Sequence, residues 1–156
     1  MIKTLYSILL AFFVFFLIFN VVKQTKENFT RKSDPKILQL KQKLRTMFNK
    51  DNYFSGKLTA LNNRDILNEL NFYVGDESYT LNKKDTYICL RNKKTGEYYD
   101  DNILMYVTLH EIAHSINTEN VGHTKEWSDI FEEVLEYAIK VGIYDPSVPI
   151  PLDYCK

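Results

Sequence analysis

The sequence predicts an α+β domain behind a single N-terminal transmembrane helix. Residues 4–22 form an apolar stretch without any charged residue, and the rest of the chain alternates helical with strand periodicity. That remainder, about 130 residues, suffices for one hydrophobic core. The expected organisation is therefore a transmembrane anchor at residues 1–22, a linker at residues 23–33 and one domain at residues 34–156.

The apolar stretch at residues 4–22 is long enough to span a bilayer as a helix. Nineteen residues of helix rise about 28 Å, close to the hydrocarbon thickness. A cleaved signal peptide is the alternative, but residues 20–24 contain no small-x-small cleavage site. More positive charges follow the stretch than precede it. The positive-inside bias then predicts a single-pass membrane protein with its domain on the cytoplasmic side and the lipid bilayer as a partner.

The charge balance argues against nucleic acid as a partner. The chain contains 20 Lys and Arg against 20 Asp and Glu, for a net charge of zero. Most of this charge lies beyond the apolar stretch, where acidic residues slightly outnumber basic ones. Domains that bind nucleic acid usually carry a basic excess.

The two cysteines, Cys89 and Cys155, are too few for a disulfide framework. A single disulfide between them requires an oxidising compartment. The sequence therefore favours two free thiols and leaves one disulfide as the alternative.

The predicted domain begins with a helix. Asp34 is placed as its N-cap and Pro35 as its first residue, and apolar residues recur at helical spacing up to about Asn49. Residues 57–61 are then expected to form a short strand. Residues 64–70 are expected to form either a helical turn or a second strand.

Two further strands are expected at residues 79–81 and 86–91, joined by a hairpin loop at residues 82–85. A helix capped by Asp100 or Asp101 follows and ends near residue 117. The last predicted helix covers residues 124–141. Its expected buried stripe comprises Trp127, Ile130, Phe131, Val134, Ala138 and Val141. A tail with three prolines, residues 145–156, is expected to lie extended over the surface.

The helix before residue 117 contains His110-Glu111-Ile112-Ala113-His114. Each helical residue turns about 100°, so His110 and His114 lie within about 40° of each other, one turn apart. Both imidazoles can then reach one metal ion. Glu111 points to the same side, beside the ion, where it can take a proton from a metal-bound water.

The surroundings of this motif favour a metal site over the alternative, a chance match with surface histidines. The opposite side of the helix carries an apolar stripe, so the helix is expected to be buried on both sides. Two histidines and a carboxylate are costly there unless they have partners. The stripe consists of Met105, Leu109, Ile112 and Ile116.

The motif and the segment after it resemble the WLM and SprT-like zincin metallopeptidases. Those proteins have His-Glu-x-x-His, a third histidine downstream and an aromatic residue on the next helix. Here the downstream segment is Gly122-His123-Thr124-Lys125-Glu126-Trp127. The chain from about Asp34 also resembles small WLM-like metallopeptidase homologues of large DNA viruses. The matching features there are residues 86–91, Lys94-Thr95-Gly96, residues 104–107, Gly142-Ile143-Tyr144 and Tyr154-Cys155.

The resemblance implies a zincin-like domain, with a small twisted sheet, an active-site helix and a C-terminal helix. It also implies one Zn²⁺ per chain bound by His110, His114 and His123, with Glu111 as the general base. Eight residues separate His114 from His123, a longer gap than is typical of the family. Glu119, within that gap, or a glutamate of the last helix therefore stays open as the third ligand.

The implied function is a membrane-anchored zinc metallopeptidase that hydrolyses peptide bonds through a zinc-bound water activated by Glu111. Its partner is a protein or peptide substrate, which can add to a sheet edge. Residues 86–91 are the candidate edge strand, although an ordinary core strand fits them equally. Tyr106 and Tyr144 are considered as oxyanion stabilisers, but each fits a core position as well.

Two other functions are weighed. The first is a non-catalytic zincin-fold module that binds or builds structure in a membrane or a virion, against which the intact Glu111 argues. The second is a protease acting on DNA-crosslinked proteins, against which the near-neutral charge argues.

Overall fold

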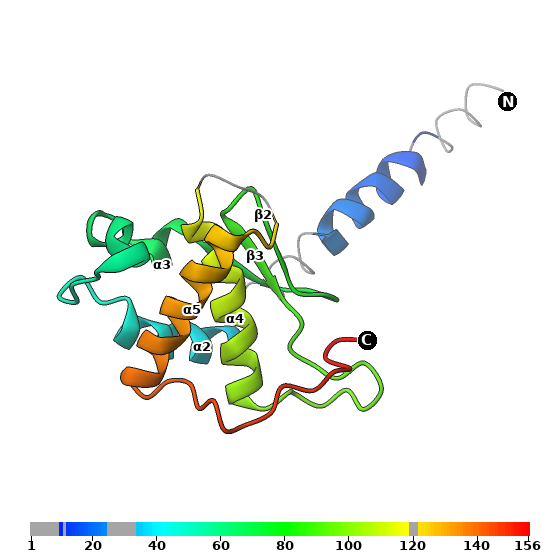
Figure 1. Ribbon diagram of the computed structural model, residues 1–156. Helices are drawn as coiled ribbons and strands as arrows, with labels where there is room; N and C mark the ends of the chain where they lie inside the picture. The colour runs from blue at the N-terminus through cyan, green and yellow to red at the C-terminus, as the bar shows by residue number, and fades with distance from the viewer. Residues whose placement is uncertain (1–9, 11, 25–33, 119–121) are drawn as a thin grey trace, which may run out of the picture.

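A three-stranded sheet and three long helices make up the domain in a computed structural model that describes residues 10, 12–24, 34–118 and 122–156 (Figure 1). In chain order the elements are α2 (Pro35–Met47), η1 (Gly56–Asn63), α3 (Ile66–Glu69), β1 (Asn71–Val74), β2 (Tyr79–Leu81), β3 (Asp85–Ile88), α4 (Asp101–Ile116) and α5 (Lys125–Lys140).

The sheet has the strand order β1–β3–β2, so β3 is its central strand. β1 runs parallel to β3, and β2 runs antiparallel to it as the second strand of a hairpin. The two central residues of the hairpin turn, Asn82 and Lys83, have φ angles of 50° and 58°. Left-handed conformations at both positions are typical of tight hairpin turns whose twist matches the strands. The predicted hairpin at residues 82–85 is therefore confirmed.

The alternation of side chains gives the sheet two different faces. Thr86 and Ile88 of β3 are completely buried on the side of the helices. On the other side Tyr87 stacks between Tyr73 of β1 and Tyr79 of β2, with ring centroids 5.1 and 4.7 Å apart. These cross-strand aromatic pairs stabilise a sheet whose strands are only three or four residues long.

A capping side chain starts each of the three long helices, at the predicted residues for α2 and α4 and at Thr124, which was predicted as a helical residue, for α5. The side chain of Asp34 accepts a hydrogen bond from the backbone N–H of Lys36 at the start of α2. Asp100 caps α4, and Thr124 caps α5 by accepting from the N–H of Trp127. A cap satisfies backbone donors that have no partner within their own helix. The three predicted helices are therefore confirmed, with ends within two residues of those expected.

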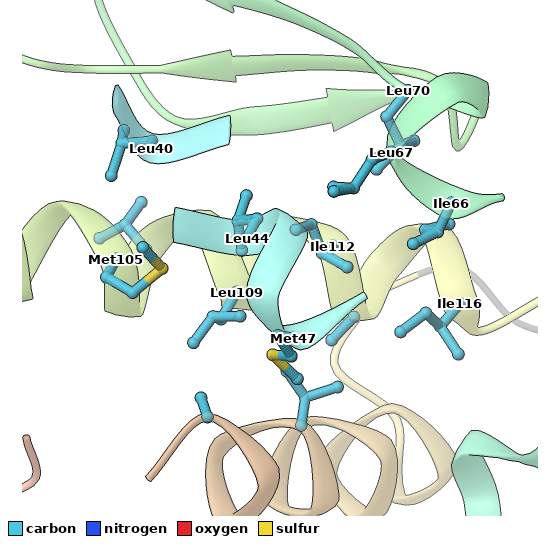
Figure 2. Close-up of a cluster of buried hydrophobic side chains, with 14 of the residues drawn as sticks. Leu40, Leu44, Met47, Ile66, Leu67, Leu70, Met105, Leu109, Ile112 and Ile116 are labelled. Carbon is cyan, nitrogen blue, oxygen red and sulfur yellow. The ribbon is translucent and has the colours of Figure 1, made fainter. Parts of the chain in front are cut away.

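The core is centred on α4, which packs against both α2 and α5 (Figure 2). The apolar stripe of α4 includes Met105, Leu109 and Ile112, all completely buried. Leu44 and Met47 of α2 meet this stripe and are also completely buried. β2 and β3 also pack against α4, so hardly any of the helix faces solvent.

Two short segments differ from the predictions. Residues 57–61 are not a strand, because they lie within the 3₁₀ helix η1. Of the two possibilities for residues 64–70 the helical turn is correct, since α3 occupies this segment and Asp65 caps it. The strand β1 directly after it was not predicted. Its four residues are too few to show a clear periodicity.

The predicted transmembrane anchor at residues 1–22 is wrong. Within residues 10, 12–24, 34–118 and 122–156, no helix combines the length and apolarity that crossing a membrane requires. Residues 1–9 and 11, which the prediction included, lie outside the described residues.

The predictions that depended on this anchor change with it. The expected single-pass membrane localisation, with the domain on the cytoplasmic side, is not supported. The predicted fold class, a zincin-like α+β domain behind a transmembrane helix, is corrected to a small mixed α/β domain.

Cys89 and Cys155 form a disulfide, with their Cα atoms 6.2 Å apart. The prediction of two free thiols is therefore wrong. Cys89 follows β3 directly, whereas Cys155 is the penultimate residue of the chain. Sixty-six positions separate the two, and nothing in the sequence indicated that they meet. The bond fastens the end of the chain to the sheet.

We expect Leu44→Ala to lower the free energy of unfolding by about 2–5 kcal/mol, because it leaves a cavity against α4. Leu44 is completely buried, whereas Leu38 on the same helix is 57% exposed. The matched control Leu38→Ala should therefore change the stability by less than about 1 kcal/mol. Urea unfolding followed by circular dichroism measures both, and equal losses would contradict this packing.

Candidate metal centre

Two elements bring the three histidines of the chain together. α4 carries His110 and His114 one turn apart, and His123 lies just before the N-cap of α5. One ring nitrogen from each histidine lies within 4.8 Å of the other two. The three side chains are thus close enough to bind one metal ion. This confirms the predicted grouping, including His123 beyond the long loop.

The spacing of the nitrogens suits a shared ion. The Nε2 atoms of His110 and His123 are 3.0 Å apart. Two nitrogens that each lie about 2.1 Å from a tetrahedral metal ion are separated by about 3.4 Å. A small adjustment of the rings would therefore allow both to coordinate. The described residues fit a metal ion in donor type and in placement.

The protonation state of the imidazoles also suits coordination. Burial lowers the pKa of His110 and of His114 from 6.5 to about 4. Neighbouring imidazoles contribute to both shifts, and the Lys83 ammonium contributes to that of His114. Metal ions bind the neutral form of histidine. Near neutral pH, protons therefore compete little with a metal ion for these two side chains.

An aromatic wall supports the histidines from α5. The indole of Trp127 lies 4.6 Å from the ring of His110, 5.0 Å from that of His114 and 4.4 Å from that of His123. Trp127 is only 8% exposed, and Phe131 stacks behind it at 5.1 Å. Packed rotamers of this kind hold ligands in place before a metal arrives. The aromatic residue that the resemblance places on the last helix, Trp127, thus contacts all three histidines directly.

Glu111 lies beside the histidines and is buried, with 4% of its surface exposed. Burial raises its pKa from 4.5 to about 7, and a hydrogen bond from Thr80 opposes part of this shift. The Thr80 hydroxyl donates to Oε2 of Glu111 over 2.9 Å. A carboxyl group with a pKa near the working pH is suited to accept and return protons.

The contribution of Thr80 was missed at the level of sequence. Thr80 is separated from Glu111 by 31 positions. One feature pointed to it: strand alternation in Tyr79-Thr80-Leu81 turns the middle, polar residue to the opposite face from its neighbours. A polar side chain that points inward needs a hydrogen-bond partner.

A cleft with a volume of about 520 Å³ joins these groups to the sheet. His110, Glu111, His114 and His123 line one wall, and β2 with its hairpin turn lines the other. The strand beside the site is therefore β2, which is an edge strand. The predicted edge strand at residues 86–91 is wrong, because β3 occupies the centre of the sheet.

The other residues considered for the site do not join the cluster. Tyr106 and Tyr144 contact each other, with ring centroids 5.7 Å apart, and pack against the core outside the cleft. Glu126 of α5 forms an ion pair with Lys57 instead. Within the described part of the chain, the group of possible metal ligands at this site contains histidines alone. Glu119 lies outside the described residues.

Comparison with known proteins finds relatives of this chain that come from viruses. It is 43% identical over 122 residues to "Uncharacterized protein 136R" of Invertebrate iridescent virus 6, across 74% of this chain and 68% of that protein. The chain belongs to the same family. It is also 45% identical over 100 residues to "Uncharacterized protein 042R" of Invertebrate iridescent virus 3, across 64% of this chain and 62% of the relative.

A more distant relative is "Uncharacterized protein R325" of Acanthamoeba polyphaga mimivirus, which is 33% identical over 130 residues, across 78% of this chain and 64% of that protein. The chain thus spans just under two thirds of two of these three relatives. No family model and no solved structure matches it. The names of the relatives assign no activity, so the function must be argued from the site.

We expect Co²⁺ to quench the fluorescence of Trp127, the only tryptophan, because its indole touches all three imidazoles. Titration of the metal-free full chain should give saturable quenching with one site per chain. His123→Ala should weaken the apparent affinity by at least about tenfold, because one of three ligands is lost. Mg²⁺, which prefers oxygen ligands, should not compete. Equal affinities of wild type and His123→Ala would remove His123 from the site.

In the metal-free protein, we expect the free energy of unfolding of Glu111→Gln to increase relative to that of the wild type as the pH rises. The raised pKa of Glu111 means that its contribution to stability is present below about pH 4.5 and is lost as the pH rises through about 7. Glutamine avoids this loss. The difference in free energy of unfolding between variant and wild type should thus increase by up to about 3 kcal/mol between pH 4.5 and 8.

Urea unfolding with a chelator present measures this difference at several pH values. Glu97→Gln, at an exposed position, controls for the removal of a surface carboxylate. A pH-independent difference for Glu111→Gln would show that its carboxyl group is not buried as described.

Proposed function

We propose that this chain is a zinc-dependent metallopeptidase. The observation that supports it most is a buried glutamate lining the same cleft as three clustered histidine nitrogens. Three imidazoles without a thiolate or a carboxylate suit zinc among the common metal ions. The motif at residues 110–114 and the downstream Gly122-His123 also resemble those of the WLM and SprT-like metallopeptidases.

In this proposal His110, His114 and His123 hold the ion, and Trp127 keeps their rings in place. A zinc ion held there would supply a Lewis acid that polarises a carbonyl and lowers the pKa of water to about 7. Glu111 accepts the proton of the attacking water on a carboxylate oxygen. It then returns that proton to the nitrogen of the leaving amine.

The substrate class follows from the shape of the cleft. β2 borders the cleft and pairs with β3 along one side only among the described residues. An extended polypeptide can therefore lie along the other side of β2 and present a carbonyl to the three histidines. We propose hydrolysis of peptide bonds in extended protein segments.

The alternatives have less support. A non-catalytic metal module would be expected to close its site with a fourth protein ligand, whereas the cluster in the described residues offers three. A buried carboxyl group with a pKa of about 7 also has no use in such a module. Action on DNA-crosslinked proteins is not favoured, since the chain has no net positive charge to bind DNA.

We expect Glu111→Gln to keep one zinc ion per chain and to lose peptidase activity by a factor of about 10²–10⁴, because the general base is absent. The assay uses fluorescein-labelled casein and the zinc-loaded full chain, with zinc content measured by mass spectrometry. Glu97→Gln serves as the control with full activity. Undiminished cleavage by Glu111→Gln would overturn the mechanism. Cleavage by neither protein, with zinc bound, would favour a non-catalytic module.

A further inference from the structure

The hydroxyl of Thr80 is the one side-chain group that donates to the Glu111 carboxylate within the described part of the chain. It lies 2.9 Å from Oε2 and also 3.2 Å from the backbone carbonyl oxygen of Glu111. A hydroxyl has a single hydrogen, and the shorter distance together with the charge of a carboxylate favours Oε2. The other oxygen of the carboxylate is left available for a proton.

A second hydroxyl group supports the contact between Thr80 and Glu111. Thr86 of β3 lies directly opposite Thr80 in the register of the two strands, and their Oγ1 atoms are 3.4 Å apart. Thr86 is completely buried and can donate to Thr80 while Thr80 donates to Glu111. The orientation of the Glu111 carboxylate therefore depends on where β2 lies.

The end of the chain holds β2 in that place. Residues 151–156 are here called the C-terminal strap. They include Tyr154, which contacts Ser78, the residue before β2. The Tyr154 hydroxyl donates to the carbonyl oxygen of Cys89 over 2.6 Å and lies 2.9 Å from the hydroxyl of Ser78. The N–H of Cys89 donates to the same Ser78 oxygen over 2.9 Å. Ser78 precedes Thr80 by two residues.

The disulfide adds a covalent bond to these hydrogen bonds. Cys155 follows Tyr154 and is bonded to Cys89, the residue that also binds Ser78 and Tyr154 through its backbone. The N–H of Cys155 donates to the Tyr99 hydroxyl over 2.8 Å, and the rings of Tyr99 and Tyr154 are 4.7 Å apart. The disulfide thus joins the strap to Cys89 after β3, and the contact between Tyr154 and Ser78 joins it to the residue before β2, the strand that carries Thr80.

We propose that Thr80 is the positioning residue of the general base Glu111, and that the disulfide-closed C-terminal strap holds Thr80 in contact with it. This inference rests on the proposed function, because it assigns Thr80 a role through Glu111. Loss of the Thr80 hydroxyl leaves the carboxylate without its oriented donor. Opening of the strap lets β2 move away from α4.

The strap opens by a thiol–disulfide exchange. A dithiol reductant breaks the bond between the Cys89 and Cys155 sulfurs, each sulfur takes one hydrogen, and the reductant closes to a cyclic disulfide. The released Cys155 no longer holds Tyr154 against Ser78 covalently. Reduction is therefore expected to disturb the orientation of the Glu111 carboxylate, as removal of the Thr80 hydroxyl does, but to a smaller extent.

The test measures the binding of acetohydroxamate to the oxidised, Co²⁺-loaded full chain. A hydroxamate chelates the ion through its oxygens and shares its hydroxyl hydrogen with the general base, so its affinity reports the position of the Glu111 carboxylate. The visible spectrum of Co²⁺ reports metal loading and hydroxamate binding separately. Thr80→Val should weaken hydroxamate binding at least about tenfold with unchanged Co²⁺ affinity, and Thr80→Ser should restore it.

Three further samples complete the experiment. Thr46→Val removes an exposed hydroxyl that bonds within α2, and it should bind hydroxamate as the wild type does. Reduction with dithiothreitol and the variant Cys155→Ser should each weaken binding about threefold or more. A count of two reactive thiols per reduced chain confirms that the bond has opened.

The outcomes separate this inference from the proposed function. If Glu111→Gln weakens hydroxamate binding but Thr80→Val stays within twofold of wild type, Thr80 does not position the base and the inference is wrong. If opening the disulfide changes nothing, the strap does not hold Thr80, which also contradicts it. Failure to load Co²⁺, or wild-type binding by Glu111→Gln, overturns the proposed function and this inference with it.

Discussion

The burial of α4 on both sides is the constraint on which the rest of the structure depends. One face packs Met105, Leu109 and Ile112 against α2 and cannot accept polar groups. The motif residues therefore lie on the remaining sides of α4, which are covered by α5 and by the sheet through β2 and β3. α5 supplies the aromatic wall of Trp127, and β2 supplies the hydroxyl of Thr80. The site is thus built from the two elements that complete the burial of one helix.

Burial also sets the electrostatics of the site. Removal from water disfavours every charged form, so it lowers the pKa of His110 and His114 and raises that of Glu111. Near neutral pH the imidazoles of His110 and His114 are therefore neutral. A bound divalent cation is attracted to the carboxylate and finds imidazoles that are already neutral. The same desolvation that makes the site costly to fold without a metal therefore prepares it to take one.

The sequence predicted the parts of this arrangement that depend on local periodicity. The faces of α4 and the stripe of α5 follow from helical spacing, and His110, Glu111 and His114 follow from one turn of helix. Contacts between distant segments were not predictable in this way. The pairing of β1 with β3 and the Thr80 hydrogen bond depend on how the strands are laid side by side. The disulfide was predicted wrongly, because composition alone does not report which cysteines lie close together.

The contact between His110 and His123 shows how the site can hold its shape without a metal. Their Nε2 atoms are 3.0 Å apart, which requires one of them to carry a hydrogen that the other accepts. A metal ion needs lone pairs on both atoms, so that hydrogen must leave or move to Nδ1. A metal ion would therefore take the place of this shared hydrogen, with Trp127 holding the rings in either case. The metal-free protein is thus pre-organised by the same geometry that coordination requires.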